Sequence, residues 1–375
     1  MGIPKLWSVC LFFLDCSCSL TIHQVLLPTA ETRSLLNLST IRGFNTNNRG
    51  LRTLIVGDDI RQIPLFILPA CLRARGGNQI AALETLFYQY SNFQEAPVTL
   101  VAVFDGPGRP AVKRGIRRIR DNPLWVTTRV KELLTALGLH FYTAPGEAEA
   151  ELAQLNKLGF IDAIITEDSD AIVFGAKLLI RTTGLVRLKP YVTQAAQIYA
   201  SESISSHPLC LDEDGLLIFA LLVGGDYDDG LPRCGPKIAH GLARCGFGRD
   251  LRWILTNFAG AKQEQELVLW RVALANELRT NSSGLLDKRH RKLAVEIPED
   301  FPNLDVVELY MDPLTSWSSR FTGTSPDTSS WIPREPNIGQ VSAFCINHFG
   351  WEATILDRLK SNLWPTVALR MIFSV

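Results

Sequence analysis

The chain has 375 residues, 46% of them hydrophobic and 20% charged, and its 38 basic side chains balance its 38 acidic ones. This composition is typical of a folded protein and excludes a disordered chain. The length allows two or three domains. With no net charge, any binding to nucleic acid depends on local basic patches.

The eight cysteines show no CxxC pair and no Cys/His zinc spacing, which favours reduced thiols. Near the N-terminus, Lys5 precedes an apolar run from Leu6 to Leu14, and small residues follow, as in a short secretory signal. No apolar run is long enough to span a membrane, so we expect no membrane partner.

Apolar segments that end in acidic residues recur along the chain. Leu54–Val56 is followed by Gly57, Asp58 and Asp59, and Thr99–Phe104 is followed by Asp105. Both segments have the pattern of buried strands. Between them, residues 63–93 are predicted to be helical, with Leu83, Leu86, Phe87 and Tyr90 on one core-facing side.

A basic segment follows Asp105. Residues 109–120 read RPAVKRGIRRIR, and six of the twelve are basic, at roughly helical spacing. Most charge runs are solvated faces, but a run beside an acidic site can also hold phosphates. The residues concerned are Lys113, Arg114, Arg117, Arg118 and Arg120.

The central stretch, residues 144–175, carries two acidic clusters. Pro145-Gly146 predicts that a helix begins at about Glu147, and Gly159 predicts its end. Leu152, Leu155 and Leu158 recur at helical spacing within it. The strand-like run 161–166 then leads into Asp168 and Asp170, two residues apart.

Further along, residues 178–188 predict a hairpin around Thr183-Gly184. Gly215–Val223 predicts a helix that leads into Asp226, and the motif DYDDG at 226–230 lacks the spacing of an EF-hand. Residues 231–239 predict a glycine turn followed by a helix, a geometry that can bind phosphate. A plain turn between helices is the common alternative.

The remaining chain is predicted to be mostly helical. Trp253, Phe258 and Trp270 are expected in the core of residues 247–312, and the basic run 288–292 is expected to be a solvated surface. Residues 313–335 are rich in Ser, Thr and Pro and predict a loop. Two closing helices are predicted at 337–351 and 355–364.

Taken singly, each acidic cluster could merely cap the next helix. Four apolar elements that deliver carboxylates to one rim, together with a helix start at Glu147 and Glu149, favour a metal site instead. Hard oxygen donors are suited to Mg²⁺ or Mn²⁺.

Five motifs in this order resemble the XPG/flap-endonuclease family of structure-specific nucleases. They are MGIPKLW at 1–7, VFDG at 103–106, APGEAEAE at 144–151, TEDSDAIVFG at 166–175 and GGDYDDGLPRCGPKIA at 224–239. The short segment after VFDG, LPRCGPKIA and a tail with FGW and LWP look most like fungal GEN/Yen-type Holliday junction resolvases. Residues 10–29 interrupt the family pattern, and we expect them to be a non-family insertion from an error in the gene model.

The resemblance implies an α/β, PIN-like nuclease core with a mostly parallel sheet flanked by helices, plus a helix–two-turn–helix element that binds DNA. The implied regions are an N-terminal nuclease region (1–110), a short arch or gateway (111–138), an internal nuclease region (139–225), a helical DNA-binding region (226–312) and a loop with closing helices (313–375).

Site residues are carried over by motif matching. The implied ligands of two Mg²⁺ ions, with Mn²⁺ as a substitute, are Asp59, Asp105, Glu147, Glu149, Asp168, Asp170 and Asp226. Asp58 is the alternative to Asp59, because the motif is irregular there. Lys113 and Arg120 would steer the scissile phosphate. Implied DNA contacts are Gly2, Lys113, Arg114, Arg117, Arg118, Gly235 and Lys237, with K⁺ at the helix–two-turn–helix.

The resemblance therefore implies a nuclear, Mg²⁺-dependent endonuclease that cuts branched double-stranded DNA in repair and recombination. Holliday junctions and 5′ flaps are the expected substrates, and cutting a junction symmetrically implies a homodimer. The alternatives are a monomeric flap endonuclease, a secreted protein, or an inactive DNA-binding protein if the region around Asp59 does not form a site.

Overall fold

The computed structural model describes residues 25–45, 50–60, 79–110, 112–113, 116–117, 124–188 and 191–373. The predicted signal-like segment and most of the interruption at 10–29 lie outside these residues. So do Gly2, Arg114 and Arg118, which were predicted to contact DNA, and Arg120, which was predicted to steer the scissile phosphate.

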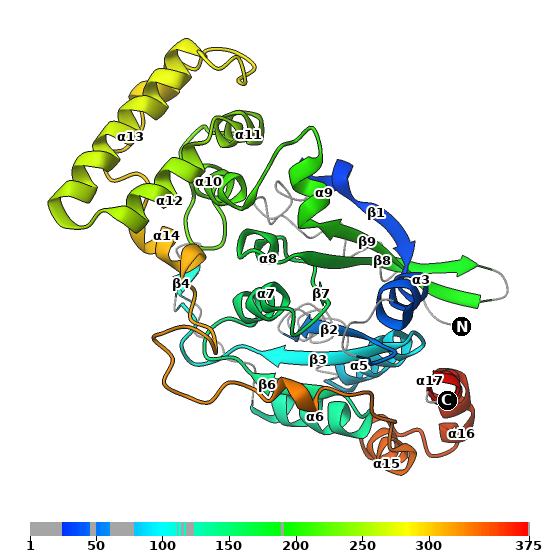
Figure 1. The fold of residues 1–375 in the computed structure, drawn as a ribbon. Helices are drawn as coiled ribbons and strands as arrows, with labels where there is room; N and C mark the ends of the chain where they lie inside the picture. Colours follow the sequence, from blue (N-terminus) through cyan, green and yellow to red (C-terminus); the bar gives the residue numbers. More distant parts are fainter. Residues whose placement is uncertain are drawn as a thin grey trace.

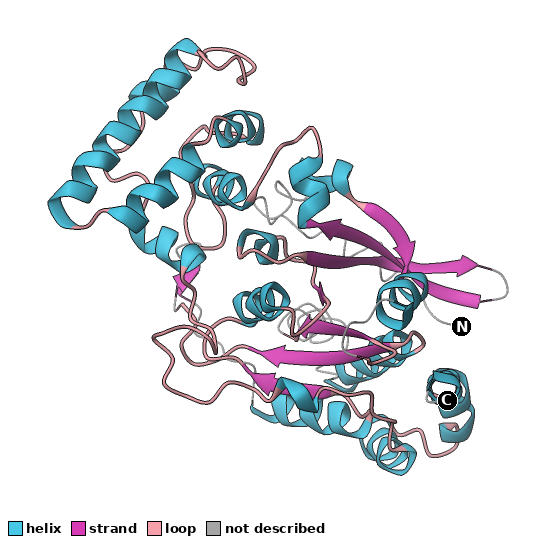
Figure 2. Ribbon diagram, in the orientation of Figure 1, coloured by secondary structure: helices cyan, strands magenta, loops and turns pink. Residues whose placement is uncertain are grey.

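A seven-stranded sheet forms the centre of the molecule (Figures 1 and 2). Its order is β1 (Glu31–Ser34), β9 (Tyr191–Ala200), β8 (Leu178–Leu188), β7 (Ala163–Ile165), β2 (Leu54–Asp59), β3 (Val98–Phe104) and β6 (His140–Thr143). The strands from β8 to β6 are parallel, whereas β9 and β1 join antiparallel at one edge. The predicted mostly parallel sheet is confirmed.

Side chains alternate along the strands and fill two cores. On β2, Ile55 packs into one core, and Leu54 and Val56 pack into the other. The first core is covered by α7 (Ala148–Leu158), α8 (Asp170–Val173) and α10 (Glu213–Val223). The second is covered by α5 (Gln79–Gln94), α6 (Leu124–Ala136), α15 (Ile338–Phe349) and α16 (Ile355–Asn362).

The helix that carries the first acidic cluster forms for the predicted reasons. Glu147 is the N-cap of α7, and Gly159 ends the helix in a left-handed conformation with φ 79°. Leu152 and Leu155 are fully buried, whereas Leu158 is 47% exposed, so only the first two anchor the helix to the sheet.

Two local predictions are wrong. The hairpin does not turn at Thr183-Gly184, because β8 continues to Leu188 and only a register shift marks this position; a glycine inside a strand is compatible with a bulge as well as a turn. The basic segment is not helical where it is described, because β4 (Val112–Lys113) pairs antiparallel with β5 (Ile116–Arg117). The edge strand β1 was not predicted.

Further helices extend beyond one end of the sheet and share its first core (Figure 1). They are α11 (Pro236–Arg244), α12 (Phe247–Asn257), α13 (Gly260–Thr280) and α14 (Leu304–Met311), with a 3₁₀ turn at Leu293–Val295. Trp270 is buried as predicted, but Trp253 is 55% exposed and is not a core residue.

The shorter elements complete the fold. They are 3₁₀ turns at Leu27–Thr29 and Thr328–Ser330, α3 (Leu35–Leu38), a π-helical segment at Ser39–Asn45, α9 (Ser201–Ser206) and α17 (Trp364–Phe373). Within the described ranges, no helix is both long enough and apolar enough to cross a bilayer.

Candidate active site

Most of the predicted acidic residues follow the carboxyl ends of neighbouring parallel strands. Asp59 is the last residue of β2, and it pairs in register with Val103, two residues before Asp105. Glu147 follows β6 at the start of α7, and Asp168 follows β7. Because carboxyl ends of parallel strands share one edge, these side chains form an acidic rim there.

The two aspartates at the end of β2 point to opposite faces of the sheet. Asp58 Oδ2 accepts a 2.8 Å hydrogen bond from the Tyr90 hydroxyl of α5, and burial raises the pKa of Asp58 to about 7. Asp59 shares the face of Gly57, where an added Cβ would lie 2.2 Å from a methyl of Leu152 in α7. Asp59 is therefore the aspartate on the same face as α7.

Asp105 links the end of β3 to the start of α7. Its Oδ1 accepts a 3.0 Å hydrogen bond from the backbone N–H of Ala148, and its Oδ2 lies 3.2 Å from Arg109 Nη1. Gly106 allows the segment after β3 to lie close to the segment before α7, because a Cβ at this position would be 1.8 Å from the carbonyl oxygen of Ala144. The helix start that carries Glu147 and Glu149 is thus fixed beside Asp105.

The centre of the rim holds several buried carboxylates close together. Glu149 is 1% exposed, and both of its carboxylate oxygens are buried. Burial raises the pKa of Asp168 well above its usual value, and the charges of Glu149, Asp170 and Asp226 raise it further. The structure therefore brings together acids from α7, from the segment after β7 and from the loop after α10.

Two tyrosines that sequence reasoning missed contact the rim. The Tyr227 hydroxyl donates a short hydrogen bond to Glu147 Oε2, and the Tyr310 hydroxyl lies 3.5 Å from Asp170 Oδ2. Burial, followed by the charge of a rim acid, raises the pKa of both phenols well above the usual value, so both hydroxyls are protonated. Tyr227 lies inside the DYDDG motif, next to the predicted ligand Asp226, and could have been suspected from the sequence. No sequence motif around Tyr310, in α14, indicated that it contacts the rim.

Glu151, in the same motif as Glu147 and Glu149, has a different environment. Its Oε1 accepts a 2.9 Å hydrogen bond from the Tyr142 hydroxyl, and its Oε2 accepts a 2.8 Å bond from the backbone N–H of Ser316. Protein donors satisfy this carboxylate, so Glu151 ties α7 to the loop after α14.

The rim residues fit a divalent cation by charge and by donor type. Buried like charges repel one another unless a cation neutralises them, and carboxylate oxygens are hard donors. Among the residues that the structure describes, no three Asp, Glu, His or Cys side chains converge closely enough to form a ready-made site.

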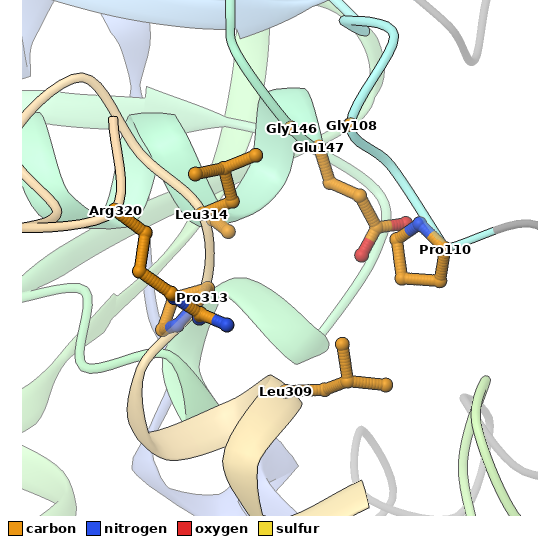
Figure 3. A pocket seen from close by; sticks show the side chains of 9 residues that line it. Gly108, Pro110, Gly146, Glu147, Leu309, Pro313, Leu314 and Arg320 are labelled. Atoms are coloured by element: carbon orange, nitrogen blue, oxygen red, sulfur yellow. The ribbon is translucent and has the colours of Figure 1, made fainter. Parts of the chain in front are cut away.

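A cavity of about 290 Å³ opens beside Glu147 (Figure 3). Gly108 and Pro110 line one side, and Leu309, Pro313, Leu314 and Arg320 line another. Arg320 is held by Glu308, 2.9 Å away. The cavity thus lies where the basic segment begins, next to an acid of the rim.

The predicted duplex-contacting turn is exposed. Gly235 is the N-cap of α11, and an added Cβ there would meet nothing within 4 Å. Lys237, in the first turn of α11, is exposed as well. Among the described residues, the space beside Gly235 is therefore open, although Pro236 has no N–H and the Ile238 N–H already donates to the Gly235 carbonyl. Lys113 and Arg117 lie in β4 and β5, where the structure describes only the backbone.

Comparisons with known proteins match this arrangement. The XPG I-region matches residues 138–226, which span β6 to Asp226. The chain is 30% identical to DNA repair protein RAD2 of Saccharomyces cerevisiae over 225 residues, and 42% identical to Flap endonuclease GEN-like 1 of Arabidopsis thaliana over 123 residues. These matches cover 59% and 32% of this chain and 19% of each relative.

A solved structure of the Holliday junction-resolving enzyme GEN1 with product DNA and Mg²⁺ superposes with a TM-score of 0.70 at 30% identity. The match covers 92% of this chain and 77% of the GEN1 chain. This chain belongs to the XPG/flap-endonuclease family. The catalytic core of Rad2, at 23% identity and a TM-score of 0.62, shares its fold.

Membership of the XPG family confirms the predicted PIN-like nuclease fold. The chain spans about a fifth of the length of the first curated relatives it matches, 19% in each case. The family I-region contains the predicted acids Glu147, Glu149, Asp168, Asp170 and Asp226. Asp59 and Asp105 precede it in the sequence and reach the same rim through β2 and β3.

Proposed function

We propose that this protein is a Mg²⁺-dependent, structure-specific endonuclease that hydrolyses phosphodiesters in branched DNA, as a Holliday junction resolvase or 5′-flap endonuclease. The observation that carries the proposal is the acidic rim, in which the charges of Glu149, Asp170 and Asp226 raise the pKa of Asp168. The rim occupies a fold that matches GEN1 in complex with product DNA and Mg²⁺.

The rim acids would hold the metal. These are Asp59, Asp105, Glu147, Glu149, Asp168, Asp170 and Asp226, with two Mg²⁺ ions expected and Mn²⁺ as a substitute. When bound, such ions supply activation of a water and stabilisation of the leaving oxygen. Arg109 and the N–H of Ala148 hold Asp105 in place, and Tyr227 orients Glu147.

DNA would be held by its backbone and its shape, not by base contacts. Lys113 and Arg120 would steer the scissile phosphate, with Arg114, Arg117 and Arg118 beside them and Gly2 near the site. Gly235 and Lys237 would grip the duplex, with K⁺ at the same turn. Symmetrical cutting of a junction calls for a homodimer, and kinship with DNA repair proteins supports action in the nucleus.

Cleavage of matched DNAs tests this proposal. The purified protein is incubated with Mg²⁺ on a four-way junction and on a 5′ flap of the same sequence, beside an Asp168→Asn/Asp170→Asn variant. Paired symmetrical nicks in the junction, absent from the variant, support a resolvase. Flap cutting alone supports a monomeric flap endonuclease. DNA binding without metal-dependent cutting contradicts an enzymatic function and leaves a DNA-binding protein.

The duplex contact has its own test. Lys237→Ala is expected to weaken binding equally on junctions and linear duplexes and to lower the salt slope of the affinity by about 1. Lys360→Ala, an exposed lysine on α16, serves as the control and should change neither quantity. An unchanged salt slope in Lys237→Ala would exclude the phosphate contact.

A further inference from the structure

Tyr310 lies where several rim elements meet. Its hydroxyl is 3.5 Å from Asp170 Oδ2, and its ring packs against Phe174 with centroids 5.5 Å apart. Asp170 is the first residue of α8, and Phe174 directly follows its last residue. The Tyr310 side chain of α14 therefore contacts both ends of α8. The residue is 5% exposed.

The same side chain contacts the loop after α10. An added Cβ on Gly225 would lie 2.6 Å from the Tyr310 hydroxyl, so the loop and the phenol are in direct contact. Gly225 precedes Asp226, the acid that this loop contributes to the rim. The position of Tyr310 therefore limits where the backbone beside Asp226 can lie.

A second tyrosine extends the contact to a third acid. The rings of Tyr310 and Tyr227 pack edge-to-face, with centroids 5.0 Å apart at 76°. The Tyr227 hydroxyl donates a hydrogen bond to Glu147 Oε2. Three acids of the rim, on three different elements, are thus connected to α14 through two phenols.

We propose that Tyr310 is a positioning residue of the metal centre, which orients Asp170 directly and Glu147 through Tyr227. This inference rests on the proposed function. It assigns a role at the metal centre to α14, which lies outside the matched I-region at residues 138–226.

Hydrogen-bond partners of metal ligands commonly set ligand orientation, and their loss typically lowers metal affinity or activity about 10- to 100-fold. A phenol held by packing is suited to this task, because its ring is fixed by neighbours and only its hydroxyl needs to meet the ligand. If Tyr310 only filled space, its ring would suffice and the hydroxyl would be dispensable.

The experiment compares two tyrosine-to-phenylalanine variants of the full chain. Tyr310→Phe removes the hydroxyl at Asp170 and keeps the ring. Tyr142→Phe removes a hydroxyl that bonds Glu151 Oε1 at 2.9 Å, a buried carboxylate that protein donors already satisfy. Mn²⁺ binding is measured by calorimetric titration in the absence of DNA, and thermal unfolding of the metal-free proteins is recorded beside it.

Tyr310→Phe is expected to raise the Kd for Mn²⁺ about 10-fold. Tyr142→Phe should change this Kd less than about 2-fold, whatever it does to stability. A Tyr227→Phe/Tyr310→Phe double variant should lose less affinity than the sum of the single losses, because both hydroxyls act on one ligand set.

Two results would overturn the inference. If the wild-type protein binds Mn²⁺ and cleaves DNA while Tyr310→Phe binds Mn²⁺ equally well, Tyr310 has only a packing role and the proposed function stands. If the wild-type protein neither binds Mn²⁺ nor cleaves branched DNA, the proposed function itself fails, and the positioning role fails with it.

Discussion

The pKa values of carboxyl groups are shifted in opposite directions in two acidic regions of this molecule. At the end of α13, Glu277 Oε1 accepts hydrogen bonds from the Ser283 hydroxyl at 2.7 Å and the Ser283 N–H at 3.2 Å, and Oε2 accepts one from the Ser282 hydroxyl. Burial acts to raise the pKa of Glu277, but these hydrogen bonds outweigh it and lower the pKa. At the rim, Asp168 is surrounded by other carboxylates, and its pKa is raised.

The difference shows what separates a structural acid from a candidate metal ligand. Glu277 is 7% exposed and the rim acid Asp226 is 6% exposed, so the exposed fraction of the residue does not distinguish them. The neighbours do. The charges of Glu149, Asp170 and Asp226 add to burial in raising the pKa of Asp168, whereas no carboxylate is among the causes that shift the pKa of Glu277.

The largest effect is expected from neutralising one acid of the rim. Glu149→Gln keeps the shape of the side chain and removes one of the charges beside Asp168. Losing the hydrogen-bond partner of a ligand lowers activity about 10- to 100-fold, so loss of a ligand itself should lower metal-dependent cleavage by at least about 100-fold. Cleavage rates at saturating Mg²⁺ measure this, and an unchanged rate would remove Glu149 from the metal site.

The matching substitution at the end of α13, Glu277→Gln, should lower the stability of the protein and leave its affinity for the metal unchanged. Glu277→Gln loses charge-assisted hydrogen bonds from Ser282 and Ser283, at a cost of about 1 kcal/mol of unfolding free energy. Chemical denaturation measures the loss, and the Kd for Mn²⁺ should not change. A changed Kd would mean that the two regions are not independent.

A smaller effect is expected on the pH dependence of the stability that Glu277 contributes. Because the pKa of Glu277 is lower in the folded protein than its usual value of 4.5, the unfolded state takes up the proton more readily. The stability from this residue is complete above pH 4.5 and is lost as the pH falls through the folded pKa. The stability difference between wild type and Glu277→Gln should therefore shrink on acidification. A difference that stays constant with pH would contradict the lowered pKa.

Much of this arrangement could be predicted from the sequence. Apolar runs that end in acids identified β2, β3 and β7, because buried parallel strands need such runs and their carboxyl ends share an edge. Pro145-Gly146 and Gly159 bracketed α7, since proline and glycine act on the local backbone. The helix predicted at Gly215–Val223 is α10, which begins earlier, at Glu213, because Asp212 accepts a hydrogen bond from the Gly215 N–H.

The parts that were missed depend on contacts between distant segments. Tyr310 meets Asp170 across 140 positions of sequence, and no local pattern reports such a contact. The local sequence Thr183-Gly184 is typical of a turn, but the pairing of β8 with β9 keeps the strand extended across this position. Sequence spacing also could not separate Glu151 from Glu149, because the donors to Glu151 come from β6 and from the loop at Ser316.

The central claim is that the rim acids are held together against their repulsion in order to bind a divalent cation. Thermal unfolding of the wild type and of Asp168→Asn, each in EDTA and in Mg²⁺, tests it most directly. The account predicts a crossover. Asp168→Asn should be the more stable protein in EDTA, because one of the like charges at the rim is gone, and Mg²⁺ should stabilise only the wild type, by about 2.7 kcal/mol at 100 times its Kd. Equal responses of the two proteins to Mg²⁺, or a wild type that is the more stable in EDTA, would contradict it.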